Sequence, residues 1–284
     1  MGANDANLTK VDHQTIEDFG EQWTRFAALS ENICSKEQLV DHCAPVFDVE
    51  TLKGASVLDI GSGSGCVVKM LMDSGVSHVT AVEPSQAMAA CKANTKAFAD
   101  RIEYVQAPGD QAPLGDFDAA ISLGVLHHIQ RPGSVVRRVR TALKPGGTFI
   151  VWIYGHEGNE LYLALMGPLR KITQRLPDVV LQPLCYLLAA ILSFYCLMCR
   201  FFPLPMAAYM RGVIARQKFR ERVLTVFDQL NPAYAKYYRR DEAIALLASN
   251  GFGDVKCYHR HGHSWTVTGR RPVERQHRTR NSSL

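Results

Sequence analysis

The fold of this chain is decided by the stretch Val57-Leu58-Asp59-Ile60-Gly61-Ser62-Gly63-Ser64-Gly65. Aliphatic residues surround its aspartate and predict a buried strand, and three glycines at alternate positions predict a tight turn after it. Glycine at a strand-to-helix turn permits positive φ and lets a ligand approach the backbone without a Cβ in the way. The helix that follows directs its free N–H groups to the same place. The stretch therefore predicts a nucleotide-like cofactor at the end of a strand.

Two classes of cofactor suit such a turn, and the glycine spacing separates them. A dinucleotide fingerprint, G-x-G-x-x-G/A, would put Cys66 at its third small position. The chain has G-x-G-x-G, and the carboxylate of Asp59 suits a cationic ligand better than a pyrophosphate. Glu83 follows eighteen residues after Gly65, at the end of a second predicted strand, where a carboxylate accepts ribose hydroxyls. The spacing thus favours an enzyme with a cationic, nucleotide-like cofactor. An NAD(P)-dependent oxidoreductase and a non-catalytic cofactor-binding protein remain the alternatives to it.

Two further motifs follow in order, FDAAISLGVLHHI at 117–129 and LKPGGTFIV at 143–151. Together with the glycine turn they resemble the class I S-adenosylmethionine-dependent methyltransferases, in their type 11/12-like, small-molecule subgroup. The resemblance covers residues 55–154. It implies an α/β fold with a doubly wound, Rossmann-like mixed sheet of seven strands, the last antiparallel, and a helical cap insertion. It also implies methyl transfer to oxygen or nitrogen of a small metabolite, lipid-like pathway intermediates included.

The same resemblance identifies the residues that would hold S-adenosylmethionine. The glycine turn corresponds to the methionine side of the site, Glu83 to the ribose acceptor and Asp110 to the partner of the adenine amino group. The cofactor-binding set is Asp59, Gly61, Ser62, Gly63, Gly65, Glu83, Pro84, Ser85, Asp110, Leu123 and Gly124.

The chain divides into a core with additions before and inside it. We expect a helical segment that covers the cofactor at 1–50, the cofactor-binding core at 51–154, a helical cap at 155–240, a closing helix and two strands at 241–270, and a disordered basic tail at 271–284. Substrate contacts are expected from Trp23, Tyr154, Asn159, Tyr162 and Tyr234.

The centre of the cap, 181–199, is unusually apolar, and three arrangements compete for it. It folds over the active site as a helix across Leu184–Met198, rests on a membrane surface, or spans a bilayer. Pro183 and the short distance to Arg200 disfavour a span. We expect a cap that encloses an apolar pocket, with peripheral membrane contact as the rival.

A hydroxyl acceptor would need a general base, and histidine titrates near neutrality. His127 follows the predicted fourth strand, at the sheet edge where ligands bind, and His156 follows the fifth. These two are the candidate catalytic residues. For the three alternating histidines at 259–263 a polar strand-end or substrate-contact role is favoured over a metal site, so no metal is predicted.

Composition indicates a globular enzyme in the cytoplasm. The first ten residues are polar and lack a secretory apolar segment, so the eight cysteines are expected to be reduced thiols. The net charge is +5, but residues 1–54 are acidic and the basic residues of 155–226 do not alternate with exposed aromatics. This distribution argues against nucleic acid as a partner.

Overall fold

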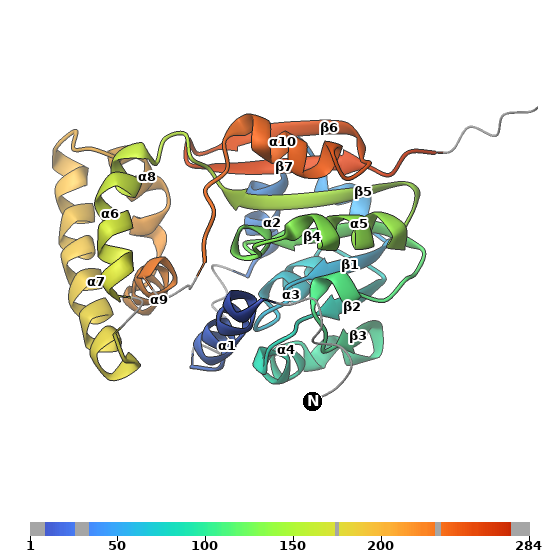
Figure 1. Cartoon of the computed structure of the whole chain (residues 1–284), viewed down its shortest axis with the longest axis horizontal. Coiled ribbons are helices and arrows are strands. Elements are labelled where there is room, and N and C mark those ends of the chain that lie inside the picture. The colour runs from blue at the N-terminus through green and yellow to red at the C-terminus, as the bar shows by residue number, and fades with distance from the viewer. Residues whose placement is uncertain (1–8, 26–33, 174–175, 231–233, 274–284) are drawn as a thin grey trace, which may run out of the picture.

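A seven-stranded mixed sheet organises the molecule (Figure 1). The computed structural model describes residues 9–25, 34–173, 176–230 and 234–273. The strands are β1 (Ser56–Ile60), β2 (His78–Val82), β3 (Ile102–Val105), β4 (Phe117–Leu123), β5 (Leu143–Tyr154), β6 (Gly253–Arg260) and β7 (Ser264–Arg270). Their order across the sheet is β3-β2-β1-β4-β5-β7-β6, with β7 antiparallel to both neighbours. The predicted sheet, with its antiparallel last strand, is confirmed.

Helices cover both faces of the sheet, as a doubly wound fold requires. On one face lie α2 (Lys36–Cys43), α3 (Cys66–Asp73) and α4 (Ala87–Asn94), and on the other α5 (Pro132–Ala142) and α10 (Arg240–Ala248). Because both faces are covered, β1 and β2 are almost continuously buried, and their sequences are correspondingly apolar. Asp59 is the acidic exception in β1. The strand order reverses at β1, because β2 and β3 are added on one side of it and β4 and β5 on the other. In such folds ligands bind in the crevice at this switch point, which lies at the carboxyl ends of β1 and β4.

The short 3₁₀ segments connect these elements. They are η1 (Val49–Leu52), η2 (Lys96–Arg101), η3 (Gly109–Gln111), η4 (Leu126–His128) and η5 (Ile214–Arg216). The N-terminal helix α1 (Lys10–Arg25) lies below the carboxyl edge of the sheet and packs near α4 (Figure 1). The predicted N-terminal helical region thus contains α1 and α2, whereas 26–33 and the predicted tail from 274 onward lie outside the described residues.

Four helices form the cap, which lies to one side of the sheet (Figure 1). They are α6 (Glu160–Thr173), α7 (Asp178–Phe201), α8 (Ala207–Gly212) and α9 (Phe219–Leu230). The inner side of α7 buries Leu181, Cys185 and Ala189 against α9. The helix predicted across 184–198 is confirmed, and it begins earlier than expected. Pro183 lies within its second turn, where its missing N–H removes only one backbone hydrogen bond.

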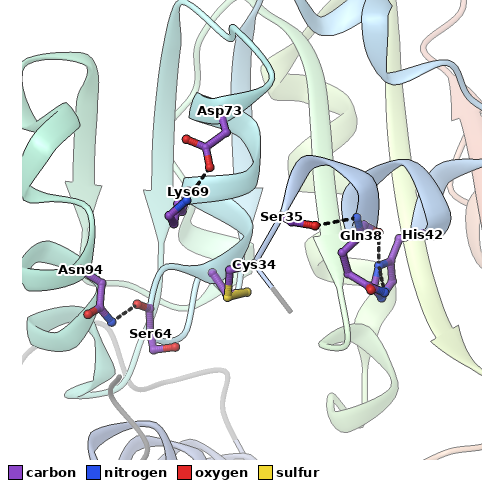
Figure 2. Close-up of a disulfide and its surroundings, with 9 residues drawn as sticks. Cys34, Ser35, Gln38, His42, Ser64, Lys69, Asp73 and Asn94 are labelled. Carbon is purple, nitrogen blue, oxygen red and sulfur yellow. Dashed lines mark hydrogen bonds and ion pairs between the residues drawn. A yellow bond between two sulfur atoms is a disulfide. The ribbon is translucent and has the colours of Figure 1, made fainter. Parts of the chain in front are cut away.

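A disulfide joins Cys34, just before α2, to Cys66 at the start of α3 (Figure 2). The prediction that all eight cysteines are reduced thiols is therefore wrong for this pair. The two residues are 32 positions apart in sequence, and only the packing of α2 on α3 brings them together. The cysteine pattern consequently no longer supports a reducing compartment.

We expect loss of this disulfide to destabilise the protein substantially. Closing a loop of this length in the unfolded chain is worth about 3 to 4 kcal/mol of unfolding free energy. Cys34→Ser should lower the denaturant midpoint to that of wild type treated with dithiothreitol, whereas Cys257→Ser should leave it unchanged. Eight free thiols in the untreated, denatured wild type would contradict the assignment.

Candidate functional site

The glycine turn after β1 has the backbone conformation that its sequence predicts. Gly61 has φ +79°, and a Cβ on it would lie 2.3 Å from Cγ2 of Val125. Its N–H and that of Ser62 both donate to the carbonyl of Val82, at 2.8 and 3.1 Å, which fixes the turn to the end of β2. A side chain at Gly61 would therefore be excluded both by conformation and by contact.

Glu83 joins the turn to the next strand. Its side chain accepts the N–H of Gly63 at 2.9 Å through Oε2 and the N–H of Ser85 at 3.0 Å through Oε1. A carboxylate offers about four acceptor positions, so roughly two remain for a ligand. Glu83 is buried but forms part of a cavity wall, as a ribose acceptor should.

Asp59 is fully buried beneath the turn. Neither carboxyl oxygen has a hydrogen-bond partner within the part of the chain that the structure describes. Burial raises the pKa of Asp59 to about 7, the charge of Glu83 adds to the increase, and the nearby Ser62 hydroxyl offsets part of it. A buried carboxyl without partners is costly, which is typical of a group that serves a ligand.

A cavity of about 850 Å³ lies above the turn, between the core and α1. Of the eleven predicted cofactor residues, eight line it, namely Gly61, Ser62, Gly63, Glu83, Pro84, Asp110, Leu123 and Gly124. Asp59, Gly65 and Ser85 lie behind this wall. Gly65 supports the turn against Cys91, and Ser85 caps the start of α4 by accepting the N–H of Ala87.

The two predicted catalytic histidines lie away from this wall. His127 is fully buried, and its ring packs 3.8 Å from that of Tyr154, centroid to centroid. His128 lines the cavity instead, but its Nδ1 lies 2.9 Å from the carbonyl of Tyr234 and so holds the segment after α9. Where residues are described, the cavity walls include neither His127 nor His156. Of the two neighbouring histidines in η4, His128 therefore faces the cavity, and the predicted His127 does not.

A second, larger cavity of about 1380 Å³ lies between the cap and the core. Apolar residues of α6, α7 and α9 form much of its wall: Met166, Leu169, Leu188, Ile191, Leu192 and Val226. Three of the predicted substrate residues, Tyr154, Asn159 and Tyr162, line it, whereas Trp23 lines the first cavity and Tyr234 lines neither among the described residues. Tyr154, Tyr162 and Tyr237 all hydrogen bond to Gln229, at 3.2, 2.7 and 3.0 Å.

The two cavities share part of their walls, and we call this shared part the junction. Its residues are His42, Trp152 and Tyr154 from the core and Gln217, Glu221 and Thr225 from the cap. Only Tyr154 was predicted as a site residue. The signal for the others is weak in sequence, because polar residues near α9 are expected in any surface helix.

Two junction residues carry groups that can accept a proton or hydrogen bond. His42 donates from Nδ1 to the carbonyl of Gln38 at 2.7 Å, so its Nε2 is the acceptor (Figure 2). Burial lowers the pKa of His42 to about 4, with Arg260 adding to the decrease, so the ring is neutral at physiological pH. Glu221 accepts the N–H of Lys218 through Oε2 at 2.7 Å, and its Oε1 is buried without a hydrogen-bond partner among the described residues.

The histidines at 259–263 belong to the end of β6 and the turn after it, and His261 and His263 line the second cavity. His259 stacks on Trp265, and His261 contacts Asp41, to which Arg260 is also paired. Within the described ranges no group of three or more histidine, cysteine or acidic side chains could hold a metal ion. The chain leaves its extended conformation after Arg260, so these side chains do not share the face that an uninterrupted strand would give them.

Comparison with known proteins identifies the core. Residues 58–151 match the methyltransferase domain family. A tRNA U34 carboxymethyltransferase of Alteromonas mediterranea is 30% identical over 135 residues, which cover 45% of this chain and 40% of that protein. A ubiquinone biosynthesis O-methyltransferase of Pseudomonas aeruginosa is 26% identical over 185 residues, 60% of this chain and 75% of that one. The chain thus spans about two fifths of the carboxymethyltransferase and three quarters of the O-methyltransferase.

Solved structures share the fold at low identity. One is the Burkholderia thailandensis 1,6-didemethyltoxoflavin-N1-methyltransferase with bound 1,6-didemethyltoxoflavin and S-adenosylhomocysteine, with TM-score 0.53, 15% identity and coverage of 95% and 93% of the two chains. Human N-acetylserotonin methyltransferase in complex with SAM has TM-score 0.51 and 16% identity, and the match covers 90% of this chain and 57% of the human chain. Residues 58–151 therefore form a methyltransferase domain of the class I S-adenosylmethionine-dependent family.

Proposed function

We propose that this protein transfers the methyl group of S-adenosylmethionine to an oxygen or nitrogen atom of a small acceptor with an apolar part. The observation that carries the proposal is the junction, where a cavity above the glycine turn meets an apolar cavity under the cap. A donor and an acceptor held in separate cavities would meet there. Such positioning is the main contribution of a protein to methyl transfer.

The residues of the first cavity fit S-adenosylmethionine. The turn offers backbone without side chains, Glu83 retains acceptor capacity, and Asp59 supplies negative charge beneath the turn. Asp110 would take the adenine amino group, and the backbone of Leu123 and Gly124 would line the cleft. When bound, the cofactor supplies an electrophilic methyl group on a sulfonium. Phe19 and Trp23 of α1 line the outer wall and would exclude water from it.

Glu221 is the residue that we propose to receive the acceptor's proton. Its Oε1 is buried at the junction without a hydrogen-bond partner in the described ranges, so an acceptor hydroxyl or amine would supply the missing donor. A carboxylate in this position would accept the proton as the new bond forms. Neutral His42 would orient the acceptor from the opposite wall through Nε2.

The apolar wall of the second cavity supports a lipid-like acceptor. Side chains of three cap helices give it an aliphatic lining, and polar groups are concentrated around Gln229 and near Arg260. Burying apolar area is favourable by about 25 cal/mol per Å², so a prenyl or acyl chain would be held there without specific contacts. A polynucleotide, with one charge per phosphate, does not suit this lining, although some relatives are named for tRNA.

Methyl incorporation from labelled S-adenosylmethionine tests the proposal. Incubation with total lipid and polar metabolite fractions should label a product in the lipid fraction, heavier than its precursor by one methylene group. Calorimetry should show binding of S-adenosylmethionine and no binding of NAD or NADP. Binding of a nicotinamide dinucleotide with no methylated product would favour the oxidoreductase instead.

The same assay tests Glu221. Glu221→Gln should lower the rate constant for transfer by about 100-fold or more, because the proton acceptor is lost, and should leave cofactor affinity unchanged. Glu160→Gln is the matched control, since Glu160 also lies in the first turn of a cap helix and accepts a backbone N–H, that of Gly158 at 3.0 Å. If both variants keep the wild-type rate and pH profile, Glu221 only caps α9.

A further inference from the structure

The outer side of α7 is the most apolar surface of the described chain. Fifteen large hydrophobic side chains are exposed among the described residues, and nine of them lie between Val179 and Phe202. Leu187, Ile191, Phe194, Leu197 and Phe201 follow one another at intervals of three or four residues, which places them on one face of the helix. Ungrouped exposed hydrophobic residues are ordinary, but a continuous stripe marks an interaction surface.

This stripe faces away from the rest of the molecule. Figure 1 shows α7 at the outer edge of the cap, farthest from the sheet. Its opposite side buries Leu181, Cys185 and Ala189 against α9, and Cys196 and Cys199 against α8. The packing therefore uses one side of α7 and leaves the other uncovered by the described chain. At 1.5 Å per residue the helix is about 36 Å long, so the stripe is long enough to contact many lipids.

The arrangement of α7 favours lying on a bilayer over crossing it. Val179–Phe201 is the one helix in the described residues with the length and apolar composition of a membrane span, and 22% of its most apolar window is buried in the fold. A spanning helix would expose its inner side to lipid as well, yet that side is covered by α9, which carries Arg220, Glu221 and Arg222. An apolar face backed by a charged helix is typical of an interfacial element.

Basic residues directly follow the stripe. The segment 200–220 contains five basic side chains and no acidic one, and all five are exposed: Arg200, Arg211, Arg216, Lys218 and Arg220. Arg211 lies on α8, which packs on the side of α7 away from the stripe, and Arg216 lines the second cavity. Arg200 ends α7 itself, and Arg220 follows Phe219, whose ring lies 6.3 Å from that of Tyr186 on α7. These two cations flank the apolar face and match the phosphates of an anionic leaflet. A second copy packed on this face with the two α7 helices parallel would bring the two basic segments together, which disfavours that arrangement.

We propose that the outer face of α7 docks on an anionic lipid bilayer, with Arg200 and Arg220 at the lipid phosphates. The proposal does not depend on the identity of the methyl acceptor. Ile191 is exposed on this face and also lines the second cavity, so docking would bring that cavity next to the lipid phase. This last consequence rests on the proposed function.

Vesicle flotation tests the proposal with a matched pair of variants. Leu187 and Leu114 are 59% and 57% exposed, and only Leu187 lies on α7. Wild type and Leu114→Glu should float with vesicles of phosphatidylglycerol and phosphatidylcholine, whereas Leu187→Glu and Phe194→Glu should lose about tenfold or more in bound fraction. Unlike Leu188 and Ile191, neither Leu187 nor Phe194 lines the second cavity. Calorimetry with S-adenosylmethionine should give the same affinity for all four proteins, which shows that they are folded.

Charge is tested separately. Arg200→Gln combined with Arg220→Gln should weaken binding to the anionic vesicles at low salt and have little effect at high salt. The proposal is overturned if wild type fails to float, if Leu187→Glu floats as well as Leu114→Glu, or if alkaline carbonate fails to release the bound protein. A dimer that Leu187→Glu converts to a monomer in light scattering, without vesicle binding by wild type, would assign the face to a second copy.

Discussion

Gly61→Ala is expected to weaken the binding of S-adenosylmethionine by more than about 100-fold, because the turn cannot keep its shape around a side chain. The new Cβ would lie 2.3 and 2.7 Å from the two methyl carbons of Val125 and 3.0 Å from its Cβ. The φ of +79° is also unfavourable for alanine. Either the turn or the segment after β4 must move, and both line the cofactor cavity. Calorimetric titration measures the effect.

Gly54→Ala separates backbone strain from contact. Gly54 has φ +74°, close to that of Gly61, but a Cβ there would meet nothing within 4 Å. This control should lose about 1 to 2 kcal/mol of stability and keep its cofactor affinity. Gly61→Ala should lose stability from both strain and contact. The double variant with Val125→Ala lacks the two shortest contacts and should recover part of the stability that Gly61→Ala loses. Wild-type affinity in Gly61→Ala would exclude the turn from the cofactor site.

The sheet and the cofactor turn could be predicted from sequence because their signals are local. A run of aliphatic residues predicts a buried strand, and positive φ at alternate turn positions favours glycine, as at Gly61 and Gly63. The carboxylate of Glu83 follows its own strand directly, so its place at the sheet edge is fixed by topology alone.

The junction could not be predicted in the same way, because it is assembled from distant segments. His42 belongs to α2 and Trp152 to β5, and the packing of α2 on the sheet brings their rings to 5.5 Å, centroid to centroid. The docking of the cap on the core then adds Glu221 of α9. The disulfide likewise joins two distant segments, because the packing of α2 on α3 brings Cys34 to Cys66. His127 and His128 show a different limit, since a neighbouring pair in a 3₁₀ turn points in different directions and sequence does not say which one faces the ligand.

Asp59→Asn is expected to stabilise the ligand-free protein at pH 8 while it weakens cofactor binding. Burial holds the pKa of Asp59 near 7 in the folded state, against 3.8 ordinarily. The folded state thus binds this proton more tightly than the unfolded state, and stability falls as pH rises from about 4 to about 7. A difference of roughly three pKa units corresponds to about 4 kcal/mol of unfolding free energy. Wild type loses this stability as pH rises, and the asparagine variant, which cannot ionise, does not.

The measurement is denaturant unfolding of wild type and variant at pH 5 and pH 8, without ligand. At pH 5 the two should be similar, or the variant slightly less stable, because a neutral carboxyl is exchanged for a neutral amide. At pH 8 the variant should be more stable by about 2 to 4 kcal/mol, the lower value allowing for an unpaired buried amide. Affinity for S-adenosylmethionine should fall about tenfold or more, since the negative charge beneath the turn is gone.

Asp118→Asn provides a control of opposite sign. The hydrogen bond from Lys144 holds the pKa of Asp118 below its usual range, so its charged form stabilises the fold above that pKa. This exposed pair contributes about 0 to 1 kcal/mol, and its loss should slightly lower stability at pH 8 without any change in cofactor affinity. If Asp59→Asn behaved like Asp118→Asn, the Asp59 carboxyl would be a stabilising group. The opposite responses expected here would instead mean that the folded protein tolerates an unfavourable buried charge at neutral pH because that charge serves a cationic ligand.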